Sequence, residues 1–212
     1  PSQIVYFTQK VAMTAVPHRK MSLEEYFEFD KNSDGRFEYF DGEVFEMSGV
    51  SVQHADIEAN LIALLKRELD GRDCRVNPAN VRIKVPKLPT YRYADISALC
   101  EDRVIEKIAD VDVLVNPSLI VEVLSPSTER YDRGEKFSEY KSIASFREYV
   151  LVSQEKKFVT LFTKHNDRFW FQSEYGDGEE LRLESLGCSL KVDDIYDGIK
   201  DRKSTRLNSS HL

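Results

Sequence analysis

The chain has 212 residues, of which 41% are apolar and 32% are charged. This length suits one ordinary domain, and the apolar content is sufficient to form a buried core. No apolar stretch approaches the roughly 20 residues that a bilayer crossing requires, and no secretory signal is visible, so a soluble, cytoplasmic protein is expected. The net charge of −7 excludes a whole-chain attraction to nucleic acid, so a nucleic-acid role needs a local site.

The two ends are set apart from the expected domain. Residues 1–18 are interpreted as an N-terminal arm, 19–199 as a single domain and 200–212 as a tail. Residues 201–211 read DRKSTRLNSSH, which is similar to the in-frame translation of a sequencing-library adapter, so they are excluded from fold reasoning. A polar disordered tail is the alternative interpretation.

The N-terminal third predicts a helix and a hairpin. Ser22, followed three residues later by Glu25, has the pattern of a capping box that opens a short amphipathic helix. Asp41-Gly42 then separates the short runs 36–40 and 43–47, and this dipeptide between two such runs is the strongest local hairpin signal. Two antiparallel strands are therefore expected here.

The next segments predict the longest helix and three strands. Apolar residues recur at helical spacing from Asp56 to Leu69, and Gly71 follows as a stop. Strands are expected over 74–76, 81–85 and 93–100.

The remaining elements predict a sheet with helices packed on it. The nearly continuous apolar run 119–124 is typical of a central strand covered on both faces. A helix is expected over 132–143, and a β-rich finish follows. Its strands are expected over 149–152, 158–163 and 169–172. The order of these elements favours a single mixed α/β or α+β sheet.

The cysteines predict no disulfide. There are three, Cys74, Cys100 and Cys188, which is an odd number with no two close in sequence. That spacing argues against both a disulfide framework and a zinc site, so we expect reduced thiols.

Two carboxylates occupy positions where buried strands are expected. Glu122 lies in the middle of LIVEVL, where an isolated ionised carboxylate would cost several kcal/mol unless it is protonated, paired or bound to a cation. Asp95 lies within YADISAL. If the two strands are neighbours, these acids converge, and Mg²⁺ suits such a site because it takes carboxylate oxygens and keeps positions for water and a phosphate. A solvent-facing or arginine-paired acid is the alternative, for Asp95 more than for Glu122.

Several segments in a fixed order carry a resemblance to a known family. They read RKMSLEEY at 19–26, RFEYFDGEV at 36–44, Gln53-His54, YADI at 93–96, VEVLSPST at 121–128 and YDRGEKF at 131–137. With these segments the chain resembles the "putative restriction endonuclease" domain family of the PD-(D/E)XK nuclease superfamily. The resemblance implies a restriction-endonuclease-like α/β (α+β) fold with a central mixed β-sheet flanked by helices. An N-terminal β-hairpin and a β-rich C-terminal part complete this expectation.

The resemblance also implies a set of site residues. Asp95 and Glu122 would be metal ligands, and Glu38 would be a further catalytic acid. The superfamily pattern has a lysine two residues after the second acid, but Leu124 stands there, and Lys136 is the position that matches the family. Its amine could orient water and offset charge at a phosphate.

Each assignment has a structural alternative. Glu38 could be a salt-bridged strand residue, and Lys136 could simply pair with Asp132 four residues earlier. His54 can face the buried side of its helix, either as a hydrogen-bonded core residue or as a residue lining the site. Tyr140 lies one helical turn beyond Lys136 and could line the site or serve packing alone.

These expectations lead to a working hypothesis of Mg²⁺- or Mn²⁺-dependent hydrolysis of DNA phosphodiesters by an activated water. A catalytically inactive nuclease-fold binding or assembly module and a small-phosphate phosphoesterase are the alternatives. A homodimer is expected by resemblance. Because the chain is acidic, DNA binding would require basic residues gathered around the site. The candidates are Arg82, Lys84, Lys87, Arg92, Arg130 and Arg133.

Overall fold

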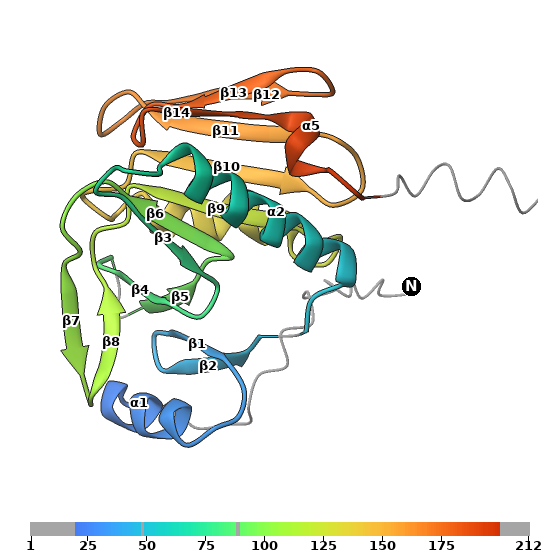
Figure 1. Cartoon of the computed structure of the whole chain (residues 1–212). Coiled ribbons are helices and arrows are strands. Elements are labelled where there is room, and N and C mark those ends of the chain that lie inside the picture. Colours follow the sequence, from blue (N-terminus) through green and yellow to red (C-terminus); the bar gives the residue numbers. More distant parts are fainter. Residues whose placement is uncertain (1–19, 48, 88–89, 200–212) are drawn as a thin grey trace, which may run out of the picture.

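The computed structural model describes residues 20–47, 49–87 and 90–199 (Figure 1). The expected N-terminal arm and the adapter-like tail lie outside these residues. The helices are α1 (Leu23–Lys31), α2 (Val52–Glu68), α3 (Glu129–Tyr131), α4 (Phe137–Tyr140) and α5 (Val192–Ile195), with a π-helical turn, η1 (Asp132–Lys136), between α3 and α4. No helix in the described ranges is long and apolar enough to cross a membrane.

The first of two large sheets contains the N-terminal hairpin. It is six-stranded, with the order β2-β1-β5-β4-β8-β7. The strands are β1 (Phe37–Phe40), β2 (Glu43–Glu46), β4 (Arg82–Val85), β5 (Thr90–Tyr93), β7 (Ile105–Ile108) and β8 (Val111–Leu114). The hairpin prediction is confirmed: β1 and β2 pair antiparallel, and Asp41 and Gly42 between them both have positive φ, as a type I′ turn requires.

Helix α1 packs on this first sheet. Its predicted capping box is confirmed, because the Ser22 side chain accepts from the Glu25 backbone and the Glu25 side chain accepts from the Ser22 backbone. Tyr26 and Phe27 are fully buried in an aromatic cluster with Tyr91 of β5. The helix therefore holds the hairpin strand that carries Glu38.

The second sheet forms the centre of the molecule. It is also six-stranded, in the order β12-β11-β10-β9-β6-β3. The strands are β3 (Arg75–Pro78), β6 (Ile96–Leu99), β9 (Leu119–Leu124), β10 (Glu148–Ser153), β11 (Val159–Lys164) and β12 (Trp170–Tyr175), with β13 (Glu180–Leu183) and β14 (Cys188–Lys191) in a separate two-stranded sheet. Strand β9 is buried at every residue, as predicted, and it runs parallel to β10 and antiparallel to β6.

Helices cover both faces of β9. Ile57, Leu61 and Leu65 of α2 pack in one cluster with Val121 and Val123. On the opposite face, the α4 residues Phe137 and Tyr140 pack in a second cluster with Ile120 and Leu124. Figure 1 shows α2 lying across β6, β9 and β10. The α+β class is therefore confirmed, and the structure adds a second large sheet to the single one expected.

Two of the predicted elements are wrong in their form. The strand expected over 93–100 is two strands, because β5 ends at Tyr93 in the first sheet and β6 begins at Ile96 in the second. A helix was expected over 132–143, but the helical segment begins at Glu129 and ends at Tyr140, and its middle is a π-helical turn. The bend at residues 94–95 thus joins the two sheets and places Asp95 at their junction.

The expectation of three reduced cysteines is also wrong. Cys74 and Cys100 form a disulfide, and Cys188 is free. The register of β3 on β6 explains the pairing: Arg75 lies opposite Leu99, so the next residues outward, Cys74 and Cys100, also meet. Residues 26 apart in sequence give no local signal of this contact.

We expect truncation of the α2 anchor to destabilise the fold. Leu65 is fully buried, so Leu65→Ala should lower the free energy of unfolding by about 2–5 kcal/mol in urea denaturation. Lys66, the next residue, is exposed and offers a control. Lys66→Ala should change the free energy of unfolding by less than about 0.5 kcal/mol. Equal effects of the two variants would contradict this packing.

Alkylation checks the disulfide. In denatured, unreduced protein, iodoacetamide should modify Cys188 alone, and Cys74 and Cys100 should react only after reduction, because both sulfurs are already bonded. Peptide mass spectrometry measures the three sites separately. Modification of all three cysteines without a reductant would contradict the assignment.

Candidate metal centre and its lysine partner

Asp95 lies at the bend before β6, outside the hydrogen-bonded ladder. Its Oδ2 accepts a 2.7 Å hydrogen bond from the backbone N–H of Val123 in β9. This bond holds the carboxylate beside the central strand, next to the backbone of Glu122. The other oxygen, Oδ1, faces helix α2.

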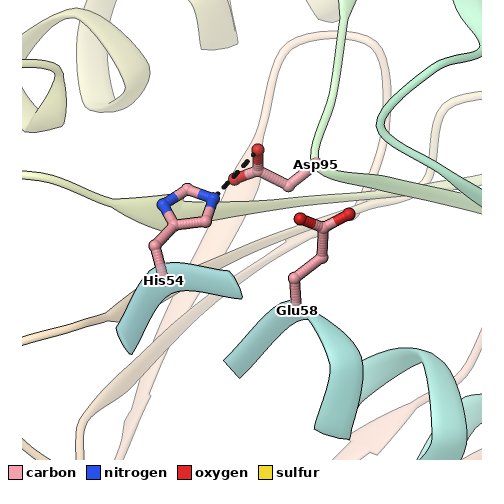
Figure 2. A group of neighbouring side chains, drawn as sticks. All are labelled: His54, Glu58 and Asp95. Atoms are coloured by element: carbon pink, nitrogen blue, oxygen red, sulfur yellow. Dashed lines mark ion pairs between the residues drawn. The ribbon is translucent and has the colours of Figure 1, made fainter. Parts of the chain in front are cut away.

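The first turns of α2 bring two side chains to Asp95. His54 Nε2 lies 3.3 Å from Asp95 Oδ1, and Glu58 follows His54 by one helical turn (Figure 2). One ligand atom from each of His54, Glu58 and Asp95 lies within 4.8 Å of the other two. Figure 2 shows the three side chains converging from the helix and the bend.

The start of α2 is fixed by its cap. The Ser51 side chain accepts from the His54 backbone N–H and donates a 2.7 Å hydrogen bond to Gln154 Oε1, just beyond β10. Helix α2 therefore begins at Val52, and His54 lies in its first turn.

The electrostatics of this cluster favour a cation. Burial lowers the pKa of His54, but the Asp95 carboxylate outweighs that effect and raises it overall. Burial raises the pKa of Glu58, and the charge of Asp95 raises it further. The two carboxylates thus lie close together beside the imidazole. His54 Nε2 is buried, and its 3.3 Å contact with Asp95 Oδ1 does not have hydrogen-bond geometry. One imidazole nitrogen and two carboxylate oxygens are a donor set that fits a divalent metal ion.

A second cluster surrounds Lys136, on the opposite face of β9 from α2. Lys136 Nζ lies 2.9 Å from Glu122 Oε1, 3.9 Å from Glu38 Oε1 and 3.8 Å from Asp132 Oδ1. The Tyr140 hydroxyl donates to Glu122 Oε1 at 3.2 Å. All of these side chains are buried.

The charges within this second cluster depend on one another. Burial alone would lower the pKa of Lys136, but Glu122, Glu38 and Asp132 outweigh burial and raise it well above its ordinary value. Burial raises the pKa of Glu122; Lys136 opposes this rise, and nearby Asp95 adds to it. Asp95 therefore couples electrostatically to both clusters.

Arg92 holds the outer side of the lysine cluster. Its guanidinium bonds Glu38 Oε2 at 3.0 Å and Glu139 Oε2 at 2.8 Å. The Tyr93 backbone N–H donates to Glu38 Oε1. Glu38 is therefore fixed by strand β5, and the salt-bridged alternative for this residue describes its contacts in the structure.

The predicted site residues thus fall into two linked groups. Glu122, Glu38, Lys136 and Tyr140 meet in one, and His54 meets Asp95 in the other. Sequence reasoning missed Glu58, although its spacing of four from His54 puts both on one face of a helix.

Most of the basic residues expected to gather for DNA are occupied by internal ion pairs. Arg82 pairs with Asp30, Lys84 with Glu106, Arg92 with Glu38 and Glu139, and Arg133 with Glu129. Lys87 and Arg130 are exposed. Four of the six expected basic side chains therefore already have an acidic partner within the chain.

Comparisons with known proteins agree with this architecture. The structure is similar to a crystal structure from Anabaena variabilis described as a putative nuclease belonging to DUF820, with a TM-score of 0.67 and 15% identity over 83% of this chain and 97% of that chain. At that identity the likeness shows the fold alone.

Two relatives come from Synechocystis sp. and are both described as uncharacterized proteins. One, slr1290, is 36% identical over 87% of this chain and 96% of its own length. The other, sll1609, is 28% identical over 81% of this chain and 97% of its own length. A profile of the Uma2 family, described as "Putative restriction endonuclease", matches residues 23–193. The chain therefore belongs to the Uma2 family, which has the restriction-endonuclease-like fold expected from its sequence.

Proposed function

We propose that this protein is a metal-dependent endonuclease that hydrolyses DNA phosphodiester bonds with water as the nucleophile. Membership of a restriction-endonuclease-like family supports nuclease chemistry. The observation that carries the proposal is the position of Asp95, which contacts the backbone beside Glu122 through one oxygen and faces His54 and Glu58 with the other.

Asp95 and Glu122 are the proposed ligands of a Mg²⁺ or Mn²⁺ ion. When bound, such an ion supplies Lewis-acid polarisation of a phosphodiester and acidifies a coordinated water. The contacts of Glu122 with Lys136 and Tyr140 both involve Oε1, so Oε2 takes part in neither. Glu122 can therefore contact the lysine and a cation through different oxygens.

Lys136 is the proposed catalytic lysine. The surrounding carboxylates raise its pKa, so it carries a full ammonium charge at neutral pH. An ammonium here can orient the attacking water by donating hydrogen bonds and can offset negative charge that develops on the phosphate. Glu38 fixes the lysine from the outer side, and Tyr140 orients Glu122.

The substrate would approach from the Asp95 side. The Lys136 side chain is 7% exposed and that of Asp95 is 13% exposed, and Glu58 is half-buried. A phosphate that reached Asp95 would leave Lys136 sheltered from bulk water, where its charge acts more strongly.

The DNA partner and the homodimer belong to the same proposal. Because most candidate basic side chains are paired internally, we infer that few phosphate contacts support DNA binding. Binding should then be weak and only modestly salt-dependent. Two copies related by a two-fold axis would place one such site on each strand.

Neutralising Asp95 should abolish cleavage. Asp95→Asn keeps an oxygen for the Val123 N–H but removes the charge, so nicking of supercoiled plasmid in Mg²⁺ or Mn²⁺ should fall by at least about 100-fold. Asp73→Asn is the control, because Asp73 forms an exposed ion pair with Arg75, and it should cut like the wild type.

The same assay separates the rival functions. Equal cutting by Asp95→Asn and the wild type would refute the assignment of Asp95. Hydrolysis of a small phosphodiester without plasmid cleavage would favour the phosphoesterase. No hydrolysis by the wild type of either substrate would favour the binding module.

Removing the lysine should make stability depend on pH. In Lys136→Met, burial would raise the pKa of Glu122 unopposed, so the folded state keeps a proton that the unfolded state releases. Its free energy of unfolding should therefore fall as pH rises above about 4.3, by up to about 1.4 kcal/mol per pH unit. Denaturation at pH 5 and pH 8 measures this, and plasmid cleavage should fall by at least about 100-fold.

Exposed Lys66 provides the matched control. Lys66→Met should keep both cleavage and the wild-type pH dependence. Lys136→Met should lose more unfolding free energy at pH 8 than at pH 5. If the free energy of unfolding of Lys136→Met lies below that of the wild type by the same amount at both pH values, the pairing with Glu122 is contradicted.

A further inference from the structure

The imidazole of His54 has an unusual environment. The residue is 6% exposed, and its Nε2 is buried without a hydrogen-bond partner, 3.3 Å from Asp95 Oδ1. The contact with Asp95 is an ion pair that lacks hydrogen-bond geometry. The nitrogen points toward the two carboxylates of Asp95 and Glu58 (Figure 2). A cation placed among these three groups could contact all of them.

The three donors are held by independent parts of the structure. The Ser51 cap and its bond to Gln154 fix the first turn of α2. The buried side chain of Ile57, between His54 and Glu58, anchors the same segment to the core. Asp95 is positioned separately by the β9 backbone. An ion would therefore enter a largely preformed site, which needs little reorganisation.

The donor chemistry discriminates between ions. Mg²⁺ prefers oxygen ligands in octahedral geometry and retains several waters. Imidazole nitrogen instead suits first-row transition metals, and combinations of histidine with carboxylates are typical of their sites. A site with His54 among its ligands should therefore gain more affinity for a transition-metal dication than for Mg²⁺.

We propose that His54, Glu58 and Asp95 form an imidazole–dicarboxylate site that selects a first-row transition-metal dication over Mg²⁺. The inference deepens the proposed function, because it names the class of ion at the Asp95 centre and adds His54 and Glu58 to the ligands. The two faces of β9 then contribute different groups to the site. The α2 face provides nitrogen and oxygen donors, and the η1 face provides the ammonium of Lys136.

Binding of Mn²⁺ alone tests the proposal. The full chain, freed of metal with a chelator, is titrated with Mn²⁺ by electron paramagnetic resonance and with Mg²⁺ by calorimetry. The wild type should bind Mn²⁺ at least 10-fold more tightly than Mg²⁺, and His54→Gln should weaken Mn²⁺ binding at least 10-fold with a much smaller effect on Mg²⁺. The spin-echo signal of bound Mn²⁺ should show coupling to an imidazole nitrogen that is lost in His54→Gln.

Two further variants complete the design. Glu58→Gln should weaken binding of both ions and retain the nitrogen coupling, because it removes an oxygen donor only. His165→Gln is the matched control, because His165 contacts Phe171 at the β11–β12 hairpin and should bind both ions like the wild type. Thermal unfolding of each metal-free variant checks that it folds. If His54→Gln does not fold, the nitrogen coupling of the wild type still shows whether an imidazole binds the ion.

The outcomes separate this inference from the proposed function. Absence of nitrogen coupling in the wild type, or a Mn²⁺ affinity unaffected by His54→Gln, would overturn the inference. Metal-dependent DNA cleavage that needs Asp95 would still support the nuclease in that case. Nitrogen-coupled Mn²⁺ without any DNA cleavage would uphold the metal site and refute the nuclease.

Discussion

The contact between Glu122 and Lys136 is the interaction on which the rest of the structure depends. A carboxylate in the middle of a fully buried strand costs several kcal/mol unless a charge opposes it. Lys136 supplies that charge at 2.9 Å, which requires the π-helical turn to dock against this face of β9. Glu38 and Asp132 then share the same ammonium, so the first sheet and the helical segment are tied to the central strand by one cation.

Local signals were sufficient for the elements that frame the site. The capping box of Ser22 and Glu25 and the turn at Asp41-Gly42 are specified by side chains within a few residues of one another, and both were predicted correctly. The apolar run of β9 identified both the central strand and its anomalous Glu122. Burial of that acid was visible because no polar neighbours in the run offered it a surface position.

Features that depend on tertiary contacts were not predictable in the same way. The run from Tyr93 to Cys100 reads as one strand, but the chain changes sheets at Asp95, whose carboxylate accepts from the β9 backbone. The Cys74–Cys100 disulfide depends on the register of two strands. The spacing of four residues between His54 and Glu58 indicates that both lie on one face of a helix. Only the position of that helix on the sheet shows that both face Asp95.

The site combines two environments across one strand. His54, Glu58 and Asp95 group metal donors on one side, and on the other side Lys136 contacts Glu122 through Oε1 alone. The most direct test is anomalous diffraction from a crystal of this protein soaked in Mn²⁺. We expect a peak about 2–2.5 Å from Asp95 Oδ1, with His54 Nε2 turned toward it. An ordered water in that position with no anomalous signal, or a peak only at unrelated surface acids, would contradict it.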